Sequence, residues 1–151
     1  MFRGFQVFVS GITLAGFTLA GASVAAAQAP APDPAKPVLT LDGDAAVINV
    51  LIKPDKTAEF ESVITKLKEA LAKSDKPERK QQLAGIKIFK SAQQVNGSVV
   101  YIFFIDPVVK GQEYDITRLI AEVFPVEVQE LFQKYKDAFV GRGISSLNKV
   151  Q

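Results

Sequence analysis

Two polar side chains, Asn49 and Tyr101, interrupt apolar stretches typical of β-strands and are the first candidates for chemistry. A polar group in the middle of a buried strand must find hydrogen-bond partners. We identify Asn49 and Tyr101, together with Phe103 two positions after Tyr101, as candidate ligand-binding residues. The alternative is that Asn49 is a structural or interface amide and that Tyr101 is a core or interface aromatic residue.

The composition excludes most of the usual catalytic groups. The 151 residues contain no histidine and no cysteine. This removes the usual general base, the thiolate nucleophile and nearly all transition-metal sites. The chain also has no phosphate-binding glycine loop, no dinucleotide-binding glycine motif and no G-x-S-x-G nucleophile motif. We therefore predict no catalytic residues, no metal site and no cofactor.

The start of the chain predicts export. Residues 1–27 have the form of a secretory signal peptide, with Arg3, an apolar run over 7–20 and small residues at 25–27. We expect cleavage after Ala27, followed by a Pro/Ala linker over residues 28–37 and one domain over 38–151. The protein is then periplasmic or secreted, and the mature chain has no predicted membrane contact.

The charge pattern argues against a nucleic-acid partner. The chain carries 18 basic and 16 acidic residues, so its net charge is +2, and the lysines are scattered rather than clustered. A nucleic-acid-binding domain would show a basic patch or stripe.

Hydrophobic periodicity predicts alternating strands and helices. Proline, glycine and capping residues mark the expected boundaries, with Asp55 as a helix N-cap, Asn96-Gly97 as a hairpin turn and Gly141-Arg142-Gly143 as a helix end. The expected elements of the first half are a strand over 45–53, a helix over 55–73 and a charged loop over 74–82. Two strands follow, one from Leu83 or Ile86 to Ala92 and one over 98–105. A helix over 112–124 then restarts after Pro125 and runs to about Val140, and a short strand over 144–150 ends the domain.

The strand over 98–105 predicts how these elements pack. It is apolar on both faces, whereas a sheet with one solvated face would alternate apolar and polar residues. Helices can cover one face, and a second copy of the chain can cover the other. We predict an α+β fold in which the strand over 45–53 pairs with that over 98–105. The strand that bears Lys87 and Lys90 then lies at the sheet edge.

This element order resembles the dimeric α/β-barrel proteins, a ferredoxin-like superfamily that includes antibiotic-biosynthesis-monooxygenase-like domains. The run from Val47 to Pro54, the following helix with Phe60 and the hairpin carry the resemblance. It implies a ferredoxin-like β-α-β-β-α-(β) sheet and a homodimer formed sheet to sheet. Members that oxidise aromatic substrates without a cofactor place Asn, Trp, Tyr, Arg or His between sheet and helices, and haem-using relatives need an axial histidine. This chain has neither tryptophan nor histidine.

Two functions of different classes follow. The first is an exported, non-catalytic binding or structural module that dimerises through its sheet and holds at most a small apolar ligand. The second is a cofactor-independent monooxygenase or isomerase acting on a small apolar or aromatic molecule. A pocket beside Asn49 and Tyr101 would favour the second function, and a solid core there would favour the first. A domain tethered by its linker and bound to another protein is a third alternative.

Overall fold

A computed structural model of the protein describes residues 36–150. The predicted signal peptide and all of the linker except its last two residues therefore lie outside the described part. The elements are β1 (Ala45–Ile52), a short 3-10 helix η1 (Pro54–Lys56), α1 (Thr57–Lys73), α2 (Pro77–Gly85), β2 (Ile86–Val95), β3 (Ser98–Ile105), α3 (Ile116–Ala121), α4 (Val128–Ala138) and β4 (Phe139–Leu147). None of the helices described is long and apolar enough to cross a membrane.

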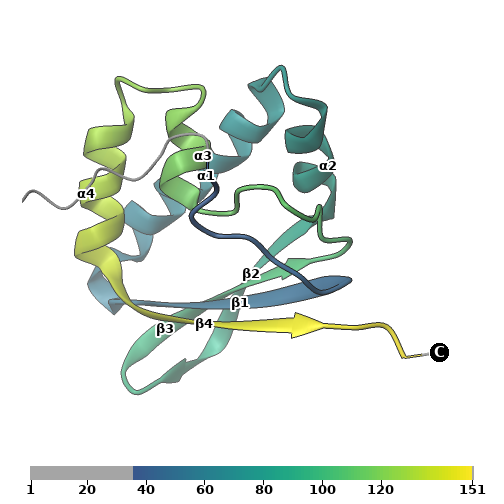
Figure 1. Ribbon diagram of the computed structural model, residues 1–151. Helices are drawn as coiled ribbons and strands as arrows, with labels where there is room; N and C mark the ends of the chain where they lie inside the picture. Colours follow the sequence, from purple (N-terminus) through teal and green to yellow (C-terminus); the bar gives the residue numbers. More distant parts are fainter. Residues whose placement is uncertain (1–35, 151) are drawn as a thin grey trace, which may run out of the picture. The chain divides into compact units, whose positions relative to one another are not determined.

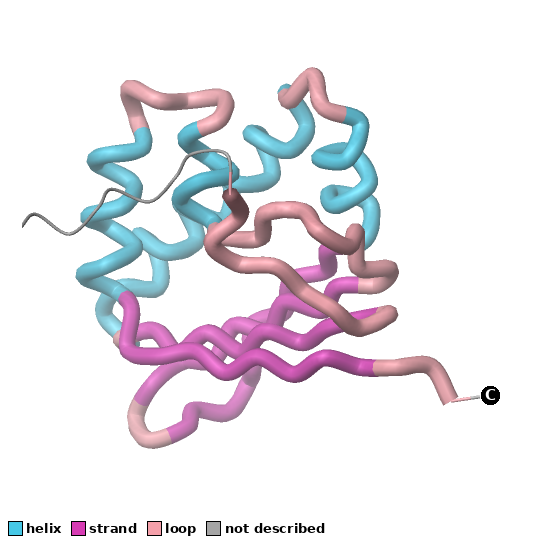
Figure 2. The backbone as a smooth tube through the Cα atoms, viewed as in Figure 1, coloured by secondary structure: helices cyan, strands magenta, loops and turns pink. Residues whose placement is uncertain are grey.

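The four strands form one antiparallel sheet in the order β2-β3-β1-β4. The helices all lie on one side of this sheet (Figures 1 and 2). β1 pairs with β3 as predicted, and the lysine-bearing β2 is an edge strand. The α+β class and the antiparallel sheet are thus confirmed.

The hairpin between β2 and β3 turns at Asn96 and Gly97. Both residues have positive φ, 50° and 73° respectively. Two consecutive positive φ values are the requirement of the tight hairpin turns that match strand twist. The predicted turn is therefore confirmed at both positions.

Helix α1 provides the side of the core that faces the sheet. The apolar side chains that recur at helical spacing along α1 are all buried, and they are Phe60, Val63, Ile64, Leu67, Ala70 and Leu71. The start of the helix differs from the expectation, because Asp55 lies within η1 and no side chain caps α1. Pro54 favours a tight first turn by its fixed φ, and the chain enters α1 through that turn instead of through a capping aspartate.

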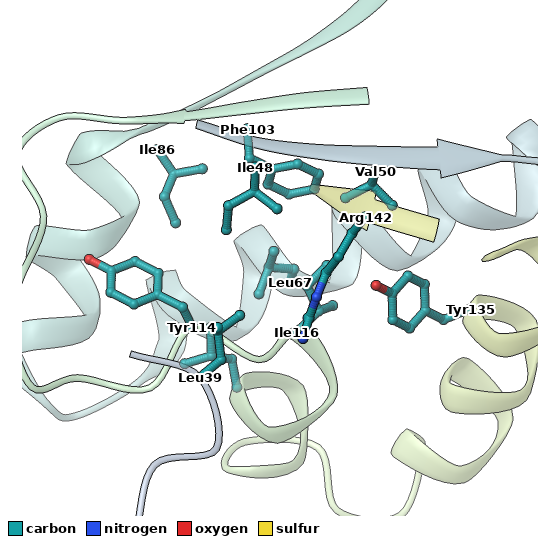
Figure 3. Close-up of a pocket in the computed structure, with 11 residues that line it drawn as sticks. Leu39, Ile48, Val50, Leu67, Ile86, Phe103, Tyr114, Ile116, Tyr135 and Arg142 are labelled. Carbon is teal, nitrogen blue, oxygen red and sulfur yellow. The ribbon is translucent and has the colours of Figure 1, made fainter. Parts of the chain in front are cut away.

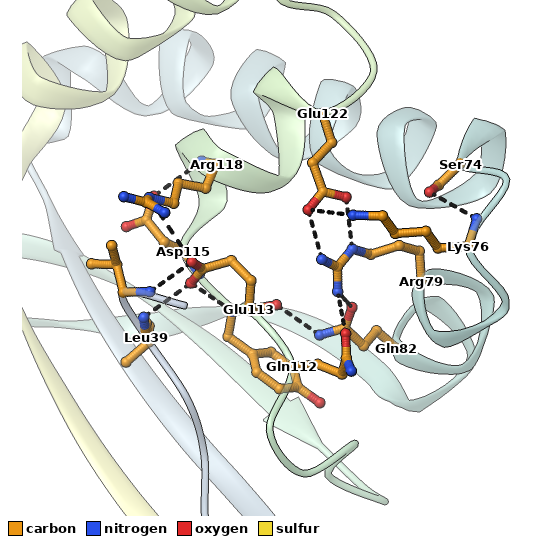
Figure 4. Close-up of polar contacts among 12 residues, drawn as sticks. Leu39, Ser74, Lys76, Arg79, Gln82, Gln112, Glu113, Asp115, Arg118 and Glu122 are labelled. Carbon is orange, nitrogen blue, oxygen red and sulfur yellow. Dashed lines mark hydrogen bonds and ion pairs between the residues drawn. The ribbon is translucent and has the colours of Figure 1, made fainter. Parts of the chain in front are cut away.

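Helix α2 is the largest difference from the sequence prediction, which placed a charged loop over 74–82. Pro77 begins the helix, and the residues it buries are Arg79, Gln82 and Gly85. A search for apolar periodicity misses such a helix because its buried face is polar. Figure 4 shows how Arg79 and Gln82 are bonded to the chain around Gln112 and Glu122.

The C-terminal third also departs from the prediction. Helix α3 has only six residues, and the Asp115 side chain caps it by accepting hydrogen bonds from the N–H groups of Thr117 and Arg118. Pro125 separates α3 from α4 as expected. Residues 141–143 do not end a helix, because β4 begins directly after α4 and includes them. The free edge of β1 explains this difference, since it pairs with β4 from Ala45 to Ile52.

Candidate ligand-binding site

A small cavity lies between the sheet and the helix layer (Figure 3). Apolar side chains dominate its wall, and the space open to the centre of a water-sized sphere is about 30 Å³. A single water needs roughly 10–15 Å³ by the same measure. The lining residues are Leu39, Ile48, Val50, Leu67, Ile86, Phe103, Tyr114, Ile116, Leu119, Tyr135 and Arg142.

Strand alternation explains which sheet residues reach the cavity. Successive side chains of a strand point to opposite faces, so Ile48 and Val50 of β1 share the face that is turned towards the helices. Phe103 lies opposite Ile48 on β3, and Arg142 lies opposite Val50 on β4. Each of these four side chains therefore contributes to the same wall.

Two polar groups of the lining are not engaged by the protein. Within residues 36–150, neither the Arg142 guanidinium nor the Tyr135 hydroxyl makes a hydrogen bond or an ion pair. Figure 3 shows the Arg142 side chain running from β4 towards Ile116, with the Tyr135 hydroxyl turned towards it. Burial raises the pKa of Tyr135, the nearby Arg142 charge acts in the opposite sense, and Asp115 adds to the effect of burial. Its phenol is thus neutral near pH 7 and available as a hydrogen-bond donor.

The three residues predicted from the sequence do not converge on this cavity. Phe103 lines it. Tyr101 faces the helices as well, but its hydroxyl donates to Glu61 Oε1 at 2.6 Å, and Lys90 Nζ lies 2.9 Å from the same oxygen. Asn49 is on the opposite face of the sheet, across from Ile102 on β3 and Gly143 on β4.

Sequence reasoning missed Arg142 and Tyr135. Arg142 stands between two glycines, a pattern we interpreted as a helix end, so the strand face to which it belongs was not visible. Tyr135 falls within the helix predicted after Pro125, and its ring packs in the core. The ring stacks on Phe60 at 5.7 Å and meets Phe139 edge to face at 5.5 Å between ring centroids. Only the tertiary arrangement shows that its hydroxyl points to an arginine.

The second face of the sheet, which we call the outer sheet face, carries a patch of apolar side chains. Phe89 on the β2 edge is 54% exposed, and Val47, Leu51, Ile102 and Phe104 are partly exposed. No helix in the described part of the chain covers this face (Figures 1 and 2). The face comprises Val47, Asn49 and Leu51 of β1, the exposed Lys87 and Phe89 of β2, Val100, Ile102 and Phe104 of β3, and the almost bare strip of Gly141, Gly143 and Ser145 on β4.

A buried carboxylate holds the cavity wall at the N-terminal end of the domain. Glu113 Oε2 accepts a hydrogen bond from the N–H of Val38 at 2.7 Å. Its Oε1 accepts three more, from the N–H groups of Leu39 at 3.0 Å, Tyr114 at 3.0 Å and Asp115 at 2.9 Å. Burial alone would raise the pKa of Glu113, but these four bonds together hold it below its ordinary value. Leu39 is thereby fixed against the cavity (Figure 4).

This carboxylate predicts a pH-dependent stability. The folded state favours ionised Glu113, so its contribution is complete above the ordinary glutamate pKa of about 4.3 and is lost as pH falls through the lower folded value. Glu113→Gln is expected to lower the free energy of unfolding by about 1–3 kcal/mol at neutral pH. Urea denaturation between about pH 7 and pH 3 should show the difference between wild type and variant shrinking towards the acid end. Glu78→Gln, at a half-buried position in the first turn of α2, is the matched control, and a difference that stays constant with pH would contradict the assignment.

Residues 36–150 contain no group of three or more acidic side chains placed to hold a metal ion. Comparison with known proteins finds no matching family model, no matching curated protein and no matching solved structure. The function must therefore be argued from the two surfaces described above, the cavity and the outer sheet face.

Proposed function

We propose that the mature chain is an exported, non-catalytic binding or structural module that forms a homodimer through its outer sheet face. The observation that carries the proposal is the apolar character of this face, which no described helix covers. Contiguous exposed apolar patches on soluble domains mark interaction sites. A second copy is the natural partner, because the same patch on both subunits makes a self-complementary interface.

The geometry of the sheet supports this arrangement. Face-to-face sheets pack about 10 Å apart, so their side chains must interdigitate. The glycine strip of β4 leaves room for the bulkier residues of a second sheet, such as Phe104 and Ile102. Asn49, near the centre of the face, then has a partner across the interface. The order β2-β3-β1-β4 with helices on one side is also what a ferredoxin-like sheet in a dimeric α/β barrel requires.

The cavity on the helix side is the proposed place for a small apolar ligand. Binding sites are mostly apolar pockets of about 300–1,000 Å³ with a few placed polar groups. The cavity has this kind of lining, but its space of about 30 Å³ is no larger than one or two waters need, so its wall must open to admit such a ligand. Export follows from the predicted signal peptide over 1–27.

The alternative, a cofactor-independent monooxygenase or isomerase, has the same cavity in its favour. It requires a group that can remove a proton from the substrate. Tyr135 is the titratable hydroxyl turned towards Arg142, and burial raises its pKa instead of lowering it. A phenol that stays protonated at neutral pH is a hydrogen-bond donor and a poor base. The binding function therefore accounts better for these residues.

The molar mass of the protein in solution tests the proposed dimer. Light scattering of the mature protein, residues 28–151, should give twice the chain mass at micromolar concentration. Ile102→Glu should weaken self-association by about a hundredfold or more, because an unpaired charge at the centre of a buried interface costs several kcal/mol. Val126→Glu is the control, since Val126 is 91% exposed on the helix side and should leave the dimer intact. A monomeric wild type would overturn the proposed dimer.

A further inference from the structure

The chain's own fold does not account for the two glycines that β4 places on the outer sheet face. A side chain on Gly141 or Gly143 would meet no atom of residues 36–150 within 4 Å, and neither glycine has a positive φ. The irregular pairing of β1 with β4 lies between Gly141 and Phe139, so Gly143 stands in regular register opposite Asn49. A strand glycine without such a local cause marks a place where another molecule approaches closely.

The outer sheet face has a bulky side and a bare side. Its middle row, in the order of the strands, is Phe89, Ile102, Asn49 and Gly143. The large side chains thus lie on β2 and β3, and the bare strip lies on β4. The strands β2 and β4 are the two edges of the sheet (Figure 1). With strands about 4.8 Å apart, Phe89 and Gly143 of one chain are roughly 14 Å from each other and cannot touch.

The direction of the two-fold axis decides what a second copy places on the bare strip. If the axis ran across the strands, β2 would face β2 of the second copy, Phe89 would press against its own copy, and the two bare strips would enclose a void. If the axis runs along the strands, β2 of each copy faces β4 of the other. Well-packed interfaces contain few voids, so the second arrangement is the one that suits the shape of this face.

We propose that the two-fold axis of the homodimer runs along the strands, so that Phe89 of each copy packs into the gap at Gly143 of the other. The neighbouring row then places Lys87 over the Ser145 hydroxyl of the second copy, where its charge meets no like charge. Because the interface is self-complementary, each contact occurs twice. This inference rests on the proposed homodimer, and it adds which residues of the two faces meet.

The first test adds bulk to the bare strip. Gly143→Phe should raise the dissociation constant of the mature dimer by about a hundredfold or more, because two new rings collide with the two Phe89 rings across the interface. Sedimentation equilibrium over a dilution series measures this constant. The new ring has open space in the single chain, so circular dichroism should show the variant folded. Ser146→Phe is the matched control, because Ser146 is an exposed residue on the opposite face of the same strand and its replacement should leave the constant unchanged.

The second test uses charge to identify the direction of the axis. Phe89→Glu combined with Gly143→Lys in one chain brings opposite charges together twice when β2 faces β4 of the other copy. Phe89→Glu combined with Gly143→Glu brings like charges together twice in the same dimer. The first double variant should dimerise about tenfold or more tightly than the second at low salt, and the difference should shrink at high salt. The reversed pair, Phe89→Lys with Gly143→Glu, should behave like the first.

The possible outcomes separate this inference from the proposed dimer. An axis across the strands would set each of the two positions against its own copy, so all of the double variants would repel and dimerise equally weakly. That result, or a Gly143→Phe variant that associates as tightly as the wild type, would overturn the inference and leave the dimer in place. A wild type that is monomeric at micromolar concentration would overturn both.

Discussion

Replacing Phe60 with alanine is expected to lower the free energy of unfolding by about 3–5 kcal/mol. Phe60 is 0% exposed and lies at the centre of an aromatic cluster. Its ring meets Tyr101 edge to face at 4.9 Å and Phe103 at 6.5 Å, and it stacks on Tyr135 at 5.7 Å. Removing the Phe60 ring leaves a void among the rings of Tyr101, Phe103 and Tyr135. The void cannot easily close, because strands and helices on both sides hold these rings in place. Alanine is the better helix former, so the loss reports packing and not helix propensity.

Urea denaturation at one fixed protein concentration measures the effect of Phe60→Ala, since association would otherwise shift the apparent stability. Phe132→Ala is the control because it makes the same substitution on α4 at a position that is 45% exposed. It should cost well under half as much. A loss of less than about 1 kcal/mol for Phe60→Ala would contradict the central role of this ring, because large-to-small changes at buried aromatic sites cost several times more.

The second large effect is expected at Arg79, which is 4% exposed. Its guanidinium donates to both carboxylate oxygens of Glu122, at 2.7 and 3.0 Å. Its Nη1 donates to Gln82 at 2.8 Å and to Gln112 at 3.2 Å (Figure 4). Arg79→Met removes all four bonds at once and should cost about 3 kcal/mol, because the buried Gln82 and the partly exposed Gln112 and Glu122 lose their donor.

A double-mutant cycle identifies the cause. Arg79→Met combined with Glu122→Met should cost less than the sum of the two single changes, because the second change removes the carboxylate that the first leaves without its main partner. Lys80→Met, at an exposed position of the same helix, controls for the loss of charge and should change stability little. Additive costs would mean that Arg79 and Glu122 act independently, against the contacts in Figure 4.

The parts of the fold that sequence reasoning predicted are those in which local pattern and tertiary burial agree. The six apolar positions of α1 recur at helical spacing, and all six are buried. Asn96 and Gly97 adopt the positive φ values that their residue types tolerate. The doubly apolar β3 lies between β1 and β2 in the sheet interior. In α1 and β3 the same residues suit both the local conformation and the core, whereas at the exposed turn the local conformation alone decides.

The prediction failed where tertiary contacts satisfy residues that look solvated. Gln82 is completely buried, and its amide donates to the Glu113 carbonyl at 2.8 Å, a partner 31 positions away. No local pattern distinguishes such a glutamine from a surface one, so α2 was predicted as a loop. In the same way, Gly141 and Gly143 are strand residues because they pair with β1 in the sheet. The cavity residue Arg142 was missed for the same reason, because the face of β4 to which it belongs depends on the pairing of β4 with β1. The direction of the Tyr135 hydroxyl depends on the ring packing around α4, which no local pattern shows.

The central position of β1 has a consequence for the order of events during synthesis. β1 is the first strand to emerge, but both of its neighbours come later, and its pairing with β4 joins Ala45 to Leu147 across about a hundred residues. Contacts of such long range form only after the loop entropy between them has been overcome. The sheet therefore remains incomplete until the residues of β4 are available. A nascent chain that cannot close its sheet early stays unfolded for longer, which is the state that the proposed export would require.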